Sequence, residues 1–192
     1  MSVTFNYSSM NAGKSLLLLK AKNDYESVNK RVVCITPSIN DRDGKGVIKS
    51  RALDTSIPAI SANANDDLFK MIEDLSNKEQ VFLVLLDEAQ FFTKLQVDQL
   101  CKISDDLGIH VMCFGLRTDS NGDLFEGSAS LLAKADKLQE VKNTCHCGKK
   151  ATMTLRLNEN NEAIKNGAQV SIGAEDSYFS VCRKHWTLGE IN

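Results

Sequence analysis

Residues 8–15 read Ser-Ser-Met-Asn-Ala-Gly-Lys-Ser, and this segment indicates the fold. It follows Val3–Tyr7, a short, partly β-branched or aromatic stretch that predicts a strand, and it leads into Ser15–Tyr25, which lacks Gly and Pro and predicts a helix. Gly-Lys-Ser between a strand and a helix is typical of a loop that binds phosphate, because its backbone N–H groups and the helix N-terminus form an anion site. Ser8 stands where such loops carry their first Gly, and the tripeptide alone also occurs by chance at helix starts.

A second element supports the phosphate loop. Val81–Leu86 is a continuous apolar run, which predicts a buried strand, and Asp87 and Glu88 follow it directly. In phosphate-loop enzymes an Asp at this place helps to hold magnesium; Lys14 would contact the β/γ-phosphates and Ser15 would ligate the metal. Glu88 is a candidate general base that activates water in an ATPase or a substrate hydroxyl in a kinase, and a solvated or ion-paired Glu is the structural alternative.

The remaining pattern predicts an α/β fold of the P-loop NTPase type, with a parallel sheet and helices on both faces. Apolar strands without alternation are separated by stretches compatible with helices. The further strands are expected at 31–36 and 109–114, the further helices at 66–75 and 92–107, and a mobile loop at 40–46.

The composition is that of a folded, water-soluble protein. Of the 192 residues, 42% are hydrophobic and 25% are charged, and the net charge is -2 with a pI near 5.9. This charge gives no general attraction to nucleic acids or membranes. No apolar stretch approaches the about 18–20 residues that cross a bilayer, and the N-terminus carries no secretion pattern, so we expect a cytoplasmic protein.

Cysteine and histidine pairs near the C-terminus predict a structural zinc site, because tetrahedral zinc takes four soft ligands. The four candidate ligands are Cys145, Cys147, Cys182 and His185. Gly148 gives the chain room to turn, although a one-residue gap between two ligands is unusual. His146 is left out because binding beside two ligating neighbours would strain the chain. We therefore expect residues 1–141 to form the nucleotide-binding domain and residues 142–192 a small β-rich zinc-binding domain.

Three other cysteines, Cys34, Cys101 and Cys113, lie in apolar or helical settings and are expected to act as small hydrophobic residues. His110, at the start of a predicted strand, is expected to be structural.

The chain resembles the zinc-containing type II thymidine kinase family, most closely its bacterial and bacteriophage branch. Five segments carry the resemblance in the family's order and cover nearly the whole chain: Tyr7–Ser15, Leu86–Phe91, Phe114–Asp119, Cys145–Lys150 and Tyr178–Trp186. The resemblance implies an ATP-dependent kinase of nucleotide salvage. It would transfer the γ-phosphate of ATP to the 5′-hydroxyl of thymidine or deoxyuridine, with Mg²⁺, giving dTMP and ADP.

The family motifs imply roles for particular residues. Glu88 matches the catalytic base, Asp87 the magnesium-site acid, and the leading Gly of the ATP loop is also a small residue in this branch. The implied ATP-site residues are Ser8, Ser9, Met10, Asn11, Ala12, Gly13, Lys14, Ser15, Asp87 and Gln90. The implied thymine-pocket residues are Met10, Phe91, Leu116 and Phe125. The implied zinc ligands are the four candidates chosen above on spacing.

In the family a segment called the lasso closes over the base between the zinc-site strands and binds it largely through backbone groups. Here it corresponds to Val170–Tyr178, and the residues expected to contact the nucleoside are Ser171, Ile172, Gly173 and Tyr178. A zinc unit that anchors both ends of this segment would exclude water from the transfer.

One departure concerns an Asp-x-Arg segment of the family's mobile loop. Arg42 matches its arginine and is implied to stabilise charge on the transferring phosphoryl group. Asn40 replaces the acid; either Asp41 takes its place or the contact is absent.

The resemblance also implies a homotetramer that is inhibited by dTTP. If a phage encodes the protein, it would act in the host cytoplasm.

Two other classes of protein stay open when the residues are considered without the resemblance. A P-loop ATPase would hydrolyse nucleotide without a nucleoside. A zinc module that binds nucleic acid would need a basic or aromatic surface, which the overall acidity disfavours.

Overall fold

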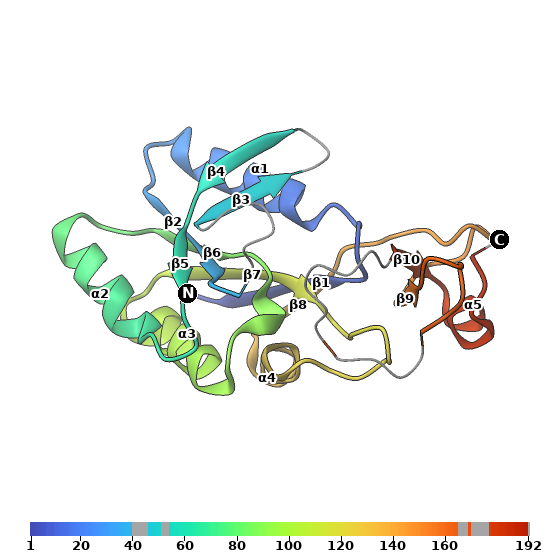
Figure 1. Ribbon diagram of the computed structural model, residues 1–192. Coiled ribbons are helices and arrows are strands. Elements are labelled where there is room, and N and C mark those ends of the chain that lie inside the picture. The colour runs from blue at the N-terminus through green and yellow to red at the C-terminus, as the bar shows by residue number, and fades with distance from the viewer. Residues whose placement is uncertain (40–45, 51–53, 165–168, 170–176, 192) are drawn as a thin grey trace.

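The computed structural model describes residues 1–39, 46–50, 54–164, 169 and 177–191. Within them the chain forms a layered α/β body and, beyond its last sheet strand, a smaller unit at the C-terminal end (Figure 1). The loop expected at 40–46 lies outside the described residues, except for Gly46.

The central sheet is parallel and, within the described ranges, contains six strands in the order β5-β2-β6-β7-β1-β8. The strands are β1 (Val3–Ser8), β2 (Val32–Pro37), β5 (Ile60–Ala62), β6 (Leu83–Leu86), β7 (His110–Leu116) and β8 (Lys137–Glu140). The predicted fold class is confirmed. Because parallel strands end at the same edge, the ends of β1 and β6 deliver the phosphate loop and Asp87 to one side of the sheet.

Both faces of the sheet are covered. One face carries α1 (Lys14–Glu26) and the hairpin of β3 (Val47–Ser50) and β4 (Thr55–Pro58) (Figure 1). The other carries α2 (Leu68–Lys78), α3 (Lys94–Asp106) and α4 (Glu126–Lys134). Strand β6 contributes side chains to the cores on both faces of the sheet. Leu83 and Leu85 pack in the core beneath α1, whereas Val84 and Leu86 pack in the core on the opposite face.

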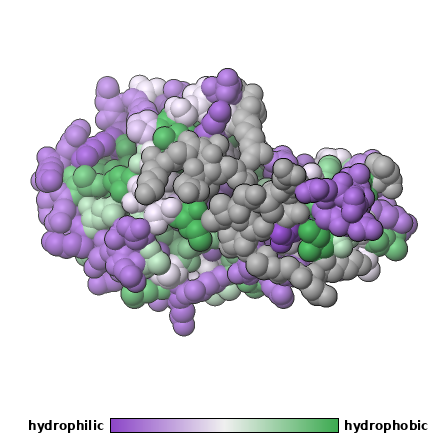
Figure 2. Space-filling model, viewed as in Figure 1, coloured by the Kyte–Doolittle hydropathy of each residue, from purple (hydrophilic) through white to green (hydrophobic). Residues whose placement is uncertain are grey.

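Local signals fix where two helices begin. The Asp67 carboxylate accepts the N–H of Lys70 at the start of α2, and Thr93 and Gln96 form a capping box at the start of α3. The helix expected at 92–107 therefore begins at Lys94. Hydrophilic residues cover the outer side of α2 at the left of the molecule (Figure 2).

The C-terminal unit contains an antiparallel pair, β9 (Met153–Leu157) and β10 (Ser177–Val181), and the helix α5 (Arg183–Leu188). Its small core includes Leu155, Leu157 and Val181, with Trp186 packed against it. In the described part of the chain, no helix is both long and apolar enough to cross a membrane.

Candidate functional site

The phosphate loop joins β1 to α1 and contains two residues with left-handed backbone. Gly13, the residue before α1, has φ 83°, and Asn11 has φ 57°. A Cβ on Gly13 would meet no atom within 4 Å, so there is room for a side chain here. Glycine is favoured because of its positive φ. Ser8 ends β1 in extended backbone, so this position does not need the conformational freedom of the glycine it replaces.

The Lys14 side chain lies across the start of the same loop. Its Nζ donates to Ser8 Oγ at 3.1 Å and to the Ser9 carbonyl at 3.0 Å. Ser8 Oγ in turn donates to the Ser9 carbonyl at 2.7 Å. The Ser8 hydroxyl therefore accepts a hydrogen bond from Lys14, which a glycine at this position could not do.

Asp87 and Ser15 meet beside this lysine. The Asp87 carboxyl is buried, and its backbone N–H donates to the Ile35 carbonyl at 3.0 Å. Burial and the neighbouring Glu88 carboxylate raise the pKa of Asp87 to about 7, although hydrogen bonds from the Glu88 backbone and the Ser15 hydroxyl and the charge of Lys14 oppose this. Burial also lowers the pKa of Lys14, against the attraction of Glu88 and Asp87. One buried carboxyl, a hydroxyl and an ammonium group thus lie together, a set of groups that could hold a divalent cation and phosphates.

Glu88 is held in an uncommon conformation directly after β6. Its backbone is left-handed, with φ 47° and ψ 43°, and the 3₁₀ helix η1 (Ala89–Phe91) begins beyond it. Glu88 Oε2 accepts from Gln90 Nε2 at 2.6 Å, and Gln90 Oε1 accepts from the Leu116 N–H at 2.9 Å. Gln90 therefore connects the carboxylate of Glu88 to the end of β7.

Helix α4 fixes η1 from the other side. A Cβ on Gly127 would lie 2.6 Å from the carbonyl oxygens of Ala89 and Phe92, so only glycine allows this approach. Ser128 Oγ donates to the Leu116 carbonyl at 2.5 Å. The backbone N–H and C=O of Leu116 are thus both fixed by side chains, those of Gln90 and Ser128.

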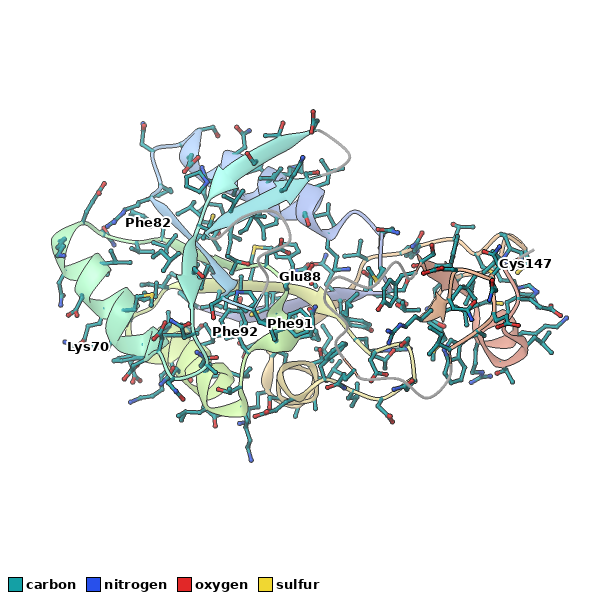
Figure 3. The ribbon with its side chains drawn as sticks, viewed as in Figure 1. Lys70, Phe82, Glu88, Phe91, Phe92 and Cys147 are labelled. Atoms are coloured by element: carbon teal, nitrogen blue, oxygen red, sulfur yellow. The ribbon has the colours of Figure 1, made fainter. Side chains whose placement is uncertain are left out.

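Of the expected thymine-pocket residues, Phe91 and Phe125 lie together beyond Glu88. Leu116 is linked to Glu88 through Gln90. The rings of Phe91 and Phe125 pack edge to face, with centroids 5.6 Å apart and an interplanar angle of 82°. Leu116 pairs with Ser8 at the adjoining ends of β7 and β1, immediately before the phosphate loop that contains Met10. In Figure 3, Glu88 and Phe91 lie together near the centre of the molecule.

The C-terminal unit approaches this region through its hairpin and through residues 117–124. Arg117 Nη2 donates to the Thr152 carbonyl at 3.1 Å, and Trp186 Nε1 donates to the Ser120 carbonyl at 2.9 Å. Tyr178 lies on β10 opposite Arg156, whose guanidinium is 5.9 Å from the centre of the tyrosine ring. Strand β10, which carries Tyr178, therefore belongs to a unit that is hydrogen-bonded to the larger α/β body.

The four soft side chains chosen from the sequence form one cluster. Among the described residues, the ligand atoms of Cys145, Cys147, Cys182 and His185 all lie within 4.8 Å of one another. Cys147 Sγ is 3.9 Å from Cys182 Sγ, and His185 Nδ1 is 3.4 Å from Cys145 Sγ and 3.5 Å from Cys182 Sγ. Ligands of a tetrahedral zinc lie about 3.5–3.8 Å apart, so the set has the size and chemistry of such a site.

Within this cluster the surroundings of Cys145 favour its thiolate, whereas the neighbouring thiols of Cys145 and Cys182 contribute to a raised pKa of Cys147. Burial raises the pKa of Cys145, but hydrogen bonds from the backbone of Cys147 and Cys182 and from the His185 side chain outweigh it and lower the pKa to about 6. The ring of His146 packs against that of His185, with centroids 4.2 Å apart and the planes tilted by 33°, and His146 is outside the four-residue cluster. In Figure 3, Cys147 lies at the far right, away from Glu88.

Several expected residues lie outside the described part of the chain. They are Asn40, Asp41, Arg42, Ser171, Ile172 and Gly173.

Other residues that build the site were not singled out from the sequence. Asp119 is buried; its Oδ1 accepts the N–H groups of Asn121 and Asp123, both at 2.9 Å, and its Oδ2 accepts from Gln169 at 3.1 Å. Asn143 and Ser180 both contact the phosphate loop. The Thr-Asp-Ser-Asn-Gly-Asp run was a local turn signal for Asp119, whereas the contacts of Asn143 and Ser180 exist only in the folded chain.

Comparison with known proteins gives one consistent result. The thymidine kinase family model matches residues 1–186. The thymidine kinase of Idiomarina loihiensis is 48% identical over 185 residues, which cover 96% of this chain and 95% of that protein. The thymidine kinase of Haemophilus influenzae strain KW20 is 48% identical over 182 residues (95% and 94%), and that of Yersinia pestis is 47% identical over 182 residues (95% and 92%).

Proposed function

The chain belongs to the thymidine kinase family, and from this premise we propose that it transfers the γ-phosphate of ATP to the 5′-hydroxyl of thymidine with Glu88 as the general base. One observation carries the assignment of the residues. Lys14, Ser15 and Asp87 meet at the same edge of the sheet as Glu88, beside the packed rings of Phe91 and Phe125. This arrangement supports a phosphate site on one side of Glu88 and the proposed thymine site on the other.

The Glu88 carboxylate accepts the proton of the 5′-hydroxyl as that oxygen attacks the γ-phosphorus. Gln90 binds the carboxylate at Oε2, and we assign Oε1 as the atom that accepts the proton. The bond between the γ-phosphorus and the bridging oxygen breaks, giving dTMP and ADP. Lys14 moves from its contacts with Ser8 and Ser9 to the phosphate oxygens, where its charge opposes the charge that develops.

We assign the remaining ATP contacts to the backbone of Ser8–Ser15 and to Gln90, and a magnesium ion to Ser15 and Asp87. Bound magnesium would supply positive charge to the phosphate oxygens. The Ser15 hydroxyl is already hydrogen-bonded to Asp87, and because burial and Glu88 raise the pKa of Asp87, a bound cation would stabilise its charged form.

The thymine base is assigned to Met10, Phe91, Leu116 and Phe125, with Tyr178 and the backbone of residues 171–173 closing over it. Deoxyuridine, which lacks only the base methyl group, is expected as a second substrate. Arg42 is proposed to stabilise the transferring phosphoryl group, with Asp41 or no residue in place of the acid that Asn40 replaces.

Residues 142–192 are proposed to form a domain distinct from residues 1–141, held by zinc. Bound zinc would link the two ends of the hairpin segment through four ligands. The spacing of the thiol and imidazole atoms supports this ion. Because these ligands must stay reduced, the cytoplasm is the expected compartment.

Two properties of the assembled enzyme are also proposed. A homotetramer is supported by exposed apolar side chains, Leu16 and Leu17 on α1 and Leu138 on the edge strand β8. Inhibition by dTTP is supported by its chemistry, because dTTP carries both the thymine base of the proposed nucleoside site and a triphosphate that the phosphate loop would bind.

The deciding experiment is an ATP-coupled assay across the natural nucleosides, with one reaction that contains no nucleoside. We expect turnover with thymidine and deoxyuridine and almost none without nucleoside. Rapid ATP hydrolysis in the absence of nucleoside would instead identify a water-activating ATPase.

A further inference from the structure

The backbone carbonyl of Met10, in the middle of the phosphate loop, is bound by two side chains from the C-terminal unit. Asn143 Nδ2 donates to it at 3.0 Å, and Ser180 Oγ donates to the same oxygen. The donors are 133 and 170 residues away in sequence. They therefore form a long-range connection between the two parts of the chain.

In the sequence, both donors lie close to residues of the Cys/His cluster (Cys145, Cys147, Cys182 and His185). Asn143 is two residues before Cys145, and Ser180 is two residues before Cys182. The backbone around them is also fixed: the Ala151 N–H donates to the Asn143 carbonyl at 2.8 Å, and Ser180 pairs with Thr154 in the β9–β10 hairpin. A metal that binds both cysteines would set the positions of both donors.

The bound carbonyl determines the direction of a backbone N–H in the loop. Because a peptide unit is planar and trans, its C=O and N–H point in opposite directions. Fixing the Met10 carbonyl toward the C-terminal unit thus turns the Asn11 N–H away from that unit. Asn11 is one of the two left-handed residues of the loop, a conformation that asparagine adopts more readily than most residues.

We propose that Asn143 and Ser180 are positioning residues for ATP, which shape the phosphate loop from the metal-held unit through the Met10 carbonyl. This proposal rests on the assignment of residues 8–15 as the ATP site. It makes nucleotide affinity depend on a unit that was expected to serve only the nucleoside.

The test measures binding of a fluorescent ADP analogue with Mg²⁺ and without nucleoside, on the full zinc-loaded enzyme. One donor is enough to hold the carbonyl, so Asn143→Ala and Ser180→Ala should each weaken binding by no more than about threefold. The double variant should weaken it by about tenfold or more. Ser180→Thr, which keeps the hydroxyl, should restore affinity when combined with Asn143→Ala. The matched control pairs Asn160→Ala with Ser56→Ala, since both of these side chains are exposed and neither belongs to a proposed binding site.

Zinc content and the thermal midpoint are measured on every variant, and Asn143→Asp serves as a second probe. Its carboxylate keeps the size of the amide but repels the Met10 carbonyl, so nucleotide should bind less tightly than to Asn143→Ala. A double variant that binds the analogue within twofold of the wild type would overturn the proposal, and so would an Asn143→Asp protein with unchanged affinity. Failure of the underlying ATP-site assignment is recognised separately, because Lys14→Ala would then leave binding intact.

Discussion

Replacing Asp87 with Asn removes a carboxyl group whose charge the ligand-free protein stabilises poorly. The side chain is 6% exposed, and burial together with Glu88 raises its pKa from 3.8 to about 7. In the unfolded chain it titrates near its ordinary pKa of about 3.9. Between these values the folded protein holds a proton that the unfolded chain has released, so the free energy of unfolding falls as pH rises through this window.

The size of the effect follows from the shift. About three pKa units correspond to an upper limit of about 4 kcal/mol above pH 7, and about 2 kcal/mol of this accumulates between pH 5.5 and pH 8.5. Asn does not titrate, so the stability of Asp87→Asn relative to the wild type should rise by about 2 kcal/mol over that interval. For a chain of this size the difference in thermal midpoint would widen by about 4–8 °C.

Urea or thermal unfolding without nucleotide, at pH 5.5, 7 and 8.5, measures this directly. Asp105→Asn, which changes an exposed carboxyl on α3, is the control and should follow the wild type at every pH. Mg·ATP should stabilise the wild type at pH 8.5 but not Asp87→Asn. A stability difference that is equal at pH 5.5 and 8.5 would refute the reasoning, because Asp87 would then carry no buried charge for a metal to neutralise.

Three further predictions concern catalysis, metal binding and packing. Glu88→Gln should bind ATP within about threefold of the wild type but lose about 10²–10⁴-fold in kcat. Glu73→Gln on α2 is the control and should keep full activity. Near wild-type turnover of Glu88→Gln would exclude Glu88 as the base. Cys182→Ser should lose zinc and lower the thermal midpoint, so full metal content and an unchanged midpoint would contradict a structural site. Gly127→Ala should lower stability by about 1–3 kcal/mol and also kcat, since the new Cβ displaces η1 and with it Glu88; activity and unfolding at wild-type levels would show that α4 does not fix η1.

The parts of the fold that sequence predicted were those with local patterns. Apolar runs identified β1, β2, β6 and β7, and the Gly-Lys-Ser segment identified the start of α1. The strand expected from residue 81 begins at Leu83, a small difference of the usual kind at element ends.

The parts that were missed depend on tertiary contacts. Helix α4 reads Glu-Gly-Ser-Ala-Ser at its start, a composition with low helix propensity, because its small residues serve close packing against η1 rather than the helix itself. Strand β8 reads Lys-Leu-Gln-Glu and lacks a strand pattern, so only its pairing with β1 defines it. The sequence predicted Glu88 as a site residue. It could not predict that Gln90 hydrogen-bonds both Glu88 and Leu116, because this contact depends on β7 packing beside η1.

The cluster of Cys145, Cys147, Cys182 and His185 and the phosphate loop look independent in the sequence, but the fold connects them. The C-terminal unit has a small core around Leu155, Leu157 and Val181, and a unit of about 50 residues rarely folds on such a core without a metal or another cross-link. The same chain segments that supply the cysteines carry the donors to Met10 and end the segment proposed to cover the base. Removing the metal should therefore weaken the binding of both substrates. The nucleoside would bind less tightly because the covering segment loses its anchor, and ATP because the phosphate loop loses its support. A zinc site with only local effects would change nucleoside binding alone.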